Sequence, residues 1–385
     1  MTPPSVTVVG GGVMGCSVLY HLAELGTTDT LLLERDALGS GSTSRTQGVL
    51  RMHYSNEVTT QMAWESLAIY RDFAEIVGSP SGYVRTGYLL AVPADYGDAL
   101  RRNVGMQAAL GVETSEVSRG DLAELAPDVA TKHDEVYAFE PQSGYADGHL
   151  VTGGYARRAE ELGATLRTDA DVDGVAVENG KVIGVRANGE VIPTGAVVVA
   201  AGPWTGPLMT RLGVELPLAT VRHQIMVMTR PPSLSHPTLG DVTNGFSSRM
   251  DAPGLSLVAL GEDPDEAGPD RYNKGVDQPA VAAGMSAMAT RVPRMSDAGF
   301  VRGWSGLLTV TPDWHPVIDR VEGIDGLYVA AGFSGHGFKM APAIGRAMAE
   351  VVVGREQTID VHALRLSRFK EGDLLGSSYP LRVLA

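Results

Sequence analysis

Cysteine is almost absent from this sequence, and long apolar runs are missing. The single cysteine among the 385 residues is Cys16, so the chain can form no internal disulfide and no metal site built from cysteines. No apolar run reaches the roughly 18 residues that cross a bilayer, and no signal peptide precedes the strand predicted from Ser5. We therefore expect a cytoplasmic protein with no membrane partner and no metal.

Basic residues are also scarce. Asp and Glu number 45 against 31 Lys and Arg, of which only five are lysines, and the formal net charge is −14. Such a charge argues against nucleic acid as a partner. Hydrophobic residues make up 44% and charged residues 20% of the chain, which is typical of a globular protein, and the length predicts two domains.

A glycine-rich turn near the N-terminus has the pattern of a dinucleotide-binding site. The turn is Gly10–Gly15, which has the form G-x-G-x-x-G. Glu34 follows nineteen residues after Gly15. Apolar residues around the turn predict a strand, a helix and a second strand at 5–9, 16–25 and 31–33.

Each residue of this pattern has a physical role. Gly10 allows a tight turn, Gly12 lets a pyrophosphate approach the backbone, and Gly15 lets the helix pack closely on the strand. The free N–H groups at the helix start favour the phosphates, and Glu34 can accept hydrogen bonds from ribose hydroxyls. Together they predict a nucleotide site rather than an ordinary glycine turn.

The rest of the chain alternates between strands, helices and glycine-rich loops. We expect the polar loop at 39–48 to cross the cofactor, with a surface linker as the alternative. Ser55 is the predicted N-cap of a helix over 57–77. A second glycine-rich loop lies at 332–339. Periodicity and two Asn-Gly turns predict strands at 87–92, 164–168, 196–200, 224–228 and 326–331, and helices at 98–110, 122–125, 150–162 and 341–353.

These motifs together resemble those of the FAD-dependent amine oxidoreductases of the D-amino-acid oxidase superfamily. The sequence is most similar to the branch of sarcosine oxidase, the β subunit of heterotetrameric sarcosine oxidase and dimethylglycine dehydrogenase. The similarity covers nearly the whole chain, and Gly332–Lys339 is its most specific part. The other matching segments are Val8–Gly15, Glu34-Arg35, Gly41–Thr43, Gly48–Tyr54, Val198–Trp204 and Thr311–Asp313.

The resemblance implies an α/β (α+β) fold with two domains. A Rossmann-like FAD-binding domain would be assembled from residues 1–80, 147–214 and 301–385. A substrate domain dominated by a mixed or antiparallel β-sheet would comprise residues 81–146 and 215–300.

The resemblance also implies which residues contact FAD. The glycines of the first turn would face the pyrophosphate, Glu34 the adenosine ribose, and the backbone of Val172 the adenine. The implied cofactor residues are Gly10, Gly12, Val13, Met14, Gly15, Glu34, Arg35, Ser42, Thr43, Ser44, Gln47, Gly48, Val172, Ala201, Gly202, Trp204, Gly306, Gly335, His336, Gly337, Phe338 and Lys339.

Arg51 and Lys339 match the two positions that hold the substrate carboxylate in sarcosine oxidase, which makes them the implied catalytic pair. Arg51 could instead form a surface salt bridge, and Lys339 could face solvent at a helix start, where a lysine is electrostatically unfavourable. Tyr54 and Arg249 are further substrate-binding candidates, with a packed tyrosine and a solvated arginine as the simpler interpretations. For His336 we expect a backbone contact to the cofactor and a packed imidazole.

The sequence departs from the superfamily at three places. Gly306 and Arg45 occupy the positions that carry flavin covalently in relatives, so we expect non-covalent FAD. Leu308 stands where glycine oxidase and D-amino-acid oxidase have a carboxylate-binding arginine, which argues against simple D-amino acids. The stretch Gly254–Gly261 lacks the lysine with which monomeric sarcosine oxidase activates oxygen, so O2 and another electron acceptor both stay open.

We therefore predict oxidation of the C–N bond of a secondary or N-substituted amino acid of the sarcosine or N-alkylglycine type. The resemblance implies hydride transfer to flavin N5 and hydrolysis of the resulting imine. One alternative is a tailoring oxidase that removes an N-carboxymethyl group from a larger amine or hydrazine as glyoxylate. Another is a non-catalytic FAD-bearing subunit of a larger complex. A weaker one, an NAD-dependent dehydrogenase, leaves the loop at 332–339 without a role.

Overall fold

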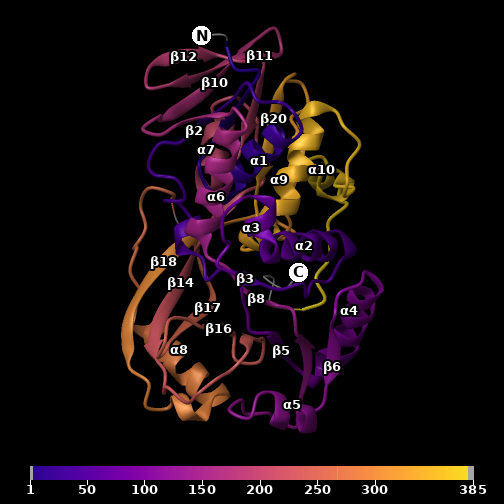
Figure 1. Cartoon of the computed structure of the whole chain (residues 1–385), viewed down its shortest axis with the longest axis vertical. Coiled ribbons are helices and arrows are strands. Elements are labelled where there is room, and N and C mark those ends of the chain that lie inside the picture. Colours follow the sequence, from indigo (N-terminus) through magenta and orange to yellow (C-terminus); the bar gives the residue numbers. More distant parts are fainter. Residues whose placement is uncertain (1–2, 267, 380–385) are drawn as a thin grey trace.

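The structure is a computed structural model that describes residues 3–266 and 268–379. Two large β-sheets dominate it, one in each half of the molecule in Figure 1. The six-stranded sheet has the order β19-β20-β13-β1-β2-β9, and the eight-stranded sheet has the order β18-β14-β17-β16-β15-β5-β7-β6. Within the described residues, no helix is long and apolar enough to cross a membrane.

The six-stranded sheet is parallel except for its edge strand β19, which pairs antiparallel with β20. The alternation of valines along its strands explains why both of its faces are covered. Val8 and Val198 face a core formed with the helices, whereas Val9 and Val199 face a second core. The strands are β1 (Val6–Val9), β2 (Thr30–Leu33), β9 (Thr165–Arg167), β13 (Ala196–Val199), β19 (Val317–Arg320) and β20 (Leu327–Ala331).

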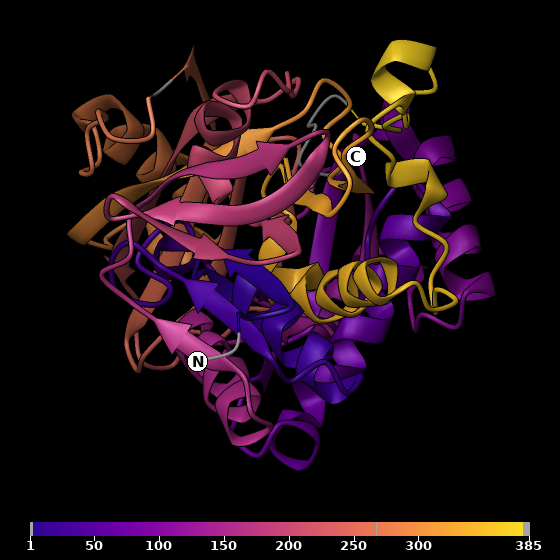
Figure 2. The same ribbon diagram turned by 90° about the horizontal axis from the view of Figure 1, so that it is seen from above.

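Helices cover one face of this sheet and a small antiparallel sheet covers the other (Figure 2). The two hairpins of the small sheet turn at Asn179-Gly180 and Asn188-Gly189, and all four residues have positive φ, which confirms the predicted Asn-Gly turns. The helices are α1 (Val13–Glu24), α6 (Gly148–Glu161) and α9 (Gly337–Val353), and the small sheet is β10 (Val172–Glu178), β11 (Lys181–Ala187) and β12 (Glu190–Pro193).

The eight-stranded sheet is assembled from two separate stretches of the chain, which meet where β15 pairs with β5 in parallel. β18 pairs with β14 along its length, although the predicted boundary at residue 300 assigns β18 to the cofactor domain. The strands are β5 (Tyr88–Pro93), β6 (Ser115–Val117), β7 (Glu135–Glu140), β14 (Ala219–Thr229), β15 (Thr238–Asp241), β16 (Phe246–Met250), β17 (Leu255–Glu266) and β18 (Phe300–Val310).

Further elements lie outside these three sheets. The three-stranded sheet β3-β8-β4 joins residues that lie far apart in the sequence. The remaining strands and α-helices are β3 (Val49–Leu50), β4 (Val84–Arg85), β8 (Gly144–Tyr145), α2 (Glu57–Arg71), α3 (Phe73–Ile76), α4 (Gly97–Ala109), α5 (Arg119–Leu125), α7 (Thr205–Thr210), α8 (Gln278–Arg291) and α10 (Arg368–Glu371).

The helix predicted over 57–77 differs from the structure in its N-cap and its length. Asn56, not Ser55, caps α2, because the Asn56 side chain accepts a hydrogen bond from the Thr59 N–H. The Ser55 hydroxyl instead accepts a hydrogen bond from the Ser378 N–H at 3.0 Å. Asp72 then interrupts the predicted helix between α2 and α3.

The helix predicted over 341–353 is α9, which begins at Gly337, so that Pro342 lies within it and not at its start. A proline has no N–H to donate to the carbonyl four residues earlier, which here is that of Phe338. The buried Tyr70 hydroxyl from α2 donates to this carbonyl instead. The earlier start places Lys339 in the first turn of α9.

Candidate functional site

A cavity of about 910 Å³ lies between the two large sheets. The carboxyl ends of β1, β2 and β13 contribute to one side of it, and β14, β17 and β18 contribute to the other. In open α/β sheets this end of the parallel strands is where ligands bind. Nineteen of the predicted site residues line the cavity: Gly10, Gly12, Val13, Met14, Glu34, Arg35, Ser42, Thr43, Gln47, Arg51, Val172, Ala201, Gly202, Trp204, Gly306, Gly335, Gly337, Phe338 and Lys339.

The first glycine turn is shaped so that its backbone is open to the cavity. Gly10 has a φ of +111°, and a Cβ there would lie 2.5 Å from the Ala200 oxygen. Gly15 does not line the cavity, and a Cβ there would lie 1.9 Å from the Gly10 oxygen, so it serves close packing. Gly12 is the N-cap of α1 without a side-chain cap. A phosphate therefore fits against this helix start.

Glu34 is held at the same end of the cavity by two backbone N–H groups. Its carboxylate accepts hydrogen bonds from the Gly11 N–H at 2.6 Å and the Asp36 N–H at 2.8 Å. Next to it, the Arg35 guanidinium lies 4.7 Å from the centre of the Trp204 ring. The Trp204 indole donates to Asp270, at 2.8 Å, from the loop that follows β17. This end of the cavity thus has a fixed acid, an aromatic ring and a cation.

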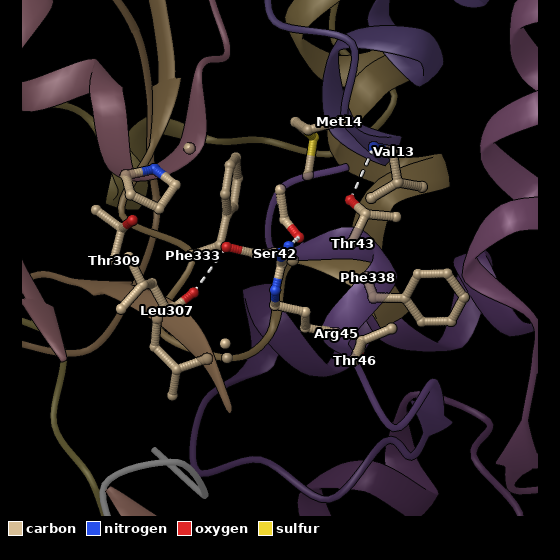
Figure 3. A pocket seen from close by; sticks show the side chains of 18 of the residues that line it. Val13, Met14, Ser42, Thr43, Arg45, Thr46, Leu307, Thr309, Phe333 and Phe338 are labelled. Carbon is tan, nitrogen blue, oxygen red and sulfur yellow. Dashed lines mark hydrogen bonds between the residues drawn. The ribbon is translucent and has the colours of Figure 1, made fainter. Parts of the chain in front are cut away.

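The polar loop at 39–48 lies across the cavity, and most of its hydroxyls are engaged within the protein. The Ser42 hydroxyl donates to the Leu307 oxygen at 2.7 Å, and the Thr43 hydroxyl accepts from the Val13 N–H at 3.1 Å (Figure 3). Ser44 does not line the cavity. Gly48 does not either, and a Cβ there would lie 2.1 Å from the Ala146 oxygen.

The loop nevertheless offers one polar group for a ligand. Gln47 lines the cavity and its Oε1 accepts a hydrogen bond from the Ser247 hydroxyl at 2.8 Å. Its buried Nε2 has no hydrogen-bond partner among the residues described. A buried donor without a partner is costly, so a ligand with an acceptor oxygen fits at this position.

Gly306 and Arg45, at which the sequence resemblance implies the flavin-carrying positions of relatives, are neighbours in the structure. A Cβ at Gly306 would lie 2.9 Å from the Arg45 Cβ. Both residues line the cavity, where Figure 3 shows Arg45 beside Ser42. The Arg45 guanidinium is itself occupied, because it donates to the Gly41 oxygen at 2.6 Å.

Arg51 and Lys339 face the same cavity, although 287 residues of sequence separate them. Arg51 is 5% exposed and Lys339 is 8% exposed. The Lys339 Nζ donates to the Gly335 oxygen at 3.1 Å, and no carboxylate in the described part of the chain pairs with it. Burial and the charge of Arg51 hold the pKa of Lys339 well below its usual range. An anion placed between the two would relieve both effects.

Tyr54 and His336 lie behind this pair and do not line the cavity. The Arg51 guanidinium lies 4.6 Å from the centre of the Tyr54 ring. The Tyr54 hydroxyl is 3.1 Å from His336 Nδ1, and both side chains are fully buried. The packed imidazole expected for His336 is therefore present, and Tyr54 supports Arg51 from behind the cavity wall.

The expectation of a solvated Arg249 is wrong. Arg249 is buried, because it donates to the Gln47 and Met250 carbonyls and pairs with Asp251 at 2.8 Å. Its guanidinium lies 4.0 Å from the centre of the Tyr145 ring. Arg249 lines a smaller cavity on the other side of the loop at 39–48 and not the main one.

Several cavity residues were missed by the sequence analysis. His223 and Ile225 of β14 both line the cavity, and their spacing of two along a strand was a usable signal. Burial and the charge of Lys339 lower the pKa of His223 to about 4, so His223 is neutral. Tyr88 of β5 and Lys274, a lysine outside the stretch Gly254–Gly261, also line the cavity. Their place depends on long-range pairing, which no local pattern reveals.

Comparisons with known proteins agree with this architecture. The family described as FAD dependent oxidoreductase matches residues 5–351. The chain is 29% identical to 4-methylaminobutanoate oxidase (formaldehyde-forming) of Paenarthrobacter nicotinovorans over 94% of its length, but spans only 45% of that protein. It is 25% identical to sarcosine oxidase subunit beta of Rhodobacter capsulatus, with 97% and 90% of the two chains covered. The crystal structure of L-proline dehydrogenase from P. horikoshii superposes with a TM-score of 0.90 at 27% identity, covering 97% and 99%.

Proposed function

Because the chain belongs to the family of FAD-dependent oxidoreductases, with FAD as its cofactor, we propose that it oxidises the C–N bond of a secondary or N-substituted amino acid. The observation that carries this proposal is the buried pair of cations, Arg51 and Lys339, facing one cavity. The relatives named above support it, since 4-methylaminobutanoate, sarcosine and L-proline are all secondary amines that bear a carboxylate.

The residues along the cavity fit the cofactor at one end. The Gly12 backbone at the start of α1 suits a pyrophosphate, Glu34 suits ribose hydroxyls, and the Gln47 Nε2 suits a ring carbonyl. When bound, FAD supplies the two-electron acceptor for oxidation of the substrate C–H bond next to nitrogen.

The residues at the other end fit an amino acid. The planar fork of Arg51 can hold a carboxylate with two parallel hydrogen bonds, and Lys339 adds a second charge. Neutral His223 gives or accepts a hydrogen bond without adding a third positive charge. Burial of this end keeps water away, which strengthens the charge contacts and holds the substrate in one orientation.

The test is anaerobic bleaching of the flavin absorbance by a panel of amino acids. We expect sarcosine, L-proline or 4-methylaminobutanoate to reduce the flavin, and glycine and D-alanine to reduce it far more slowly. Faster reduction by the primary amines would overturn the proposed substrate class. Repeating the panel in air reports whether O2 reoxidises the flavin. Lys274 and Lys339 line the cavity and are the lysines that could assist the reaction with O2.

A second proposal concerns assembly, because one relative is a subunit by name and the chain covers 90% of it. We propose that the chain can also act as the FAD-bearing subunit of a larger complex. Turnover by the isolated chain at the same rate as in its native extract would contradict a need for a partner.

A further inference from the structure

The segment after residue 351, where the family match ends, is fastened to the molecule at two places. At the first, the fully buried Arg368 donates to both carboxylate oxygens of Asp313, at 2.8 and 3.0 Å, and to the His315 carbonyl at 2.8 Å. In Figure 1 the segment then runs from α10 past α2 toward α4. At the second, Tyr379, which is 4% exposed, places its hydroxyl 2.8 Å from His53 Nε2.

The second attachment lies directly behind the carboxylate-binding end of the cavity. The carbonyl of His53 accepts a hydrogen bond from Arg51 Nη1. The His53 imidazole is fully buried, and its Nδ1 has no partner among the described residues, so the contact with Tyr379 orients the ring. Burial and the charge of Arg51 lower the pKa of His53 to about 3, which keeps the ring neutral.

We propose that Tyr379 is a positioning residue for Arg51. By fixing the His53 ring, it fixes the adjacent carbonyl that orients the Arg51 guanidinium toward the cavity. Tyr379 itself does not line the cavity, so it acts on Arg51 through His53 and not by contact with a ligand. The inference rests on the proposed function, because it assumes that Arg51 binds the substrate carboxylate.

The local structure around Tyr379 suits this role. The Ser377 hydroxyl accepts a hydrogen bond from the Tyr379 N–H at 3.2 Å and donates to the Tyr379 carbonyl at 3.0 Å. The Ser378 N–H donates to the Ser55 hydroxyl at 3.0 Å. These contacts hold the backbone at Tyr379 and at the residue before it, so that the phenol reaches His53.

The experiment is isothermal titration of the FAD-loaded full chain with acetate and with its uncharged counterpart acetamide. Tyr379→Phe keeps the ring and removes the hydroxyl. We expect it to weaken acetate binding by about three- to tenfold, as the loss of one hydrogen bond predicts, and to leave acetamide binding and FAD content unchanged. Tyr96→Phe is the control, because the Tyr96 ring lies 6.2 Å from that of Tyr379, whereas the His53 ring contacts among the described residues are with Tyr379.

A double-mutant cycle separates positioning from packing. If Tyr379 acts through Arg51, Tyr379→Phe has no further effect on acetate binding in the Arg51→Ala background. An equal effect in both backgrounds, or equal weakening of acetate and acetamide, overturns the positioning role. The positioning role is also overturned if Arg51→Ala weakens acetate binding and Tyr379→Phe does not. If Arg51→Ala binds acetate like the wild type, the proposed function itself fails. Should Tyr379→Phe not fold, Ser377→Ala removes the hydroxyl that holds the Tyr379 backbone, and the resulting misplacement of the phenol must give the same selective loss of acetate binding.

Discussion

Two residues, Arg51 and Lys339, carry most of the functional argument because buried cations are rare. Lysine and arginine are seldom buried unless they are paired, and Lys339 has no carboxylate partner in the ranges that the structure covers. The charge of Arg51 makes the burial of Lys339 more costly still. An anionic ligand would therefore stabilise these two buried charges.

The lowered pKa of Lys339 predicts a pH dependence of substrate binding. A bound carboxylate favours the protonated lysine and raises its pKa in the complex. Affinity for the acid is therefore greatest below the pKa of the free protein, and it falls as pH rises from that value to the pKa of the complex. The dissociation constant of acetate measured against pH checks this. In Lys339→Met the slope should disappear, and a wild-type profile that is equally flat would contradict the role of Lys339.

Single residues were predictable where a local pattern required them. Gly10, Gly12 and Glu34 could be placed at the cavity because the two glycines and the acid follow a pattern of fixed spacing. The spacing of His223 and Ile225 indicates only that they share one face of a strand, because the place of that face in the cavity follows from the pairing of β14 with β17 and β18. Arg249 was misjudged for the same reason, because its partner Gln47 lies 202 residues away.

At the scale of elements, α9 shows how tertiary contacts extend a helix past its local signals. Pro342 suggests a start close before it, yet α9 begins at Gly337. The α2 residues Tyr70 and Ser66 bond to the first turns of α9, at the Phe338 carbonyl and the Ala343 N–H. The helix start, with Gly335 and Gly337 at the cavity, therefore depends on α2.

Removal of the Tyr70 hydroxyl tests this dependence. In Tyr70→Phe the buried Phe338 carbonyl loses its donor, and we expect a decrease of about 1–3 kcal/mol in the free energy of unfolding. Urea unfolding followed by circular dichroism measures it. Tyr328→Phe, at a partly buried position on β20, is the control and should change stability by less than about 0.5 kcal/mol. If Tyr70→Phe is as stable as Tyr328→Phe, the Phe338 carbonyl needs no donor.

At the scale of the whole molecule, the cavity exists only because distant segments meet. The glycine turn, the loop at 39–48, β14, β18 and the start of α9 all contribute to it. The strand–turn–helix units and the Asn-Gly hairpins could be predicted from sequence, since their signals are local. The sheet order and the place of β18 could not, because they depend on pairings between residues far apart in the chain.

The residues at the cavity also indicate whether FAD is bound covalently. Gly306 and Arg45 are adjacent in the structure, and neither offers a nucleophile for a covalent link. The only cysteine, Cys16, is buried in α1. We therefore expect acid precipitation of the purified protein to release the yellow flavin into the supernatant. Flavin that stays with the precipitated protein would contradict this expectation.

The most direct test of the account is rapid-mixing reduction of the flavin by a secondary amino acid and by its uncharged amide. In Arg51→Ala, loss of the charged hydrogen bonds should lower the second-order rate of reduction by the acid on the order of ten- to a hundredfold. Reduction by the amide should change little, and so should both rates in Arg302→Ala, an exposed arginine outside the cavity. If Arg51→Ala is reduced by the acid as fast as the wild type, Arg51 does not hold the carboxylate and the proposed site is wrong.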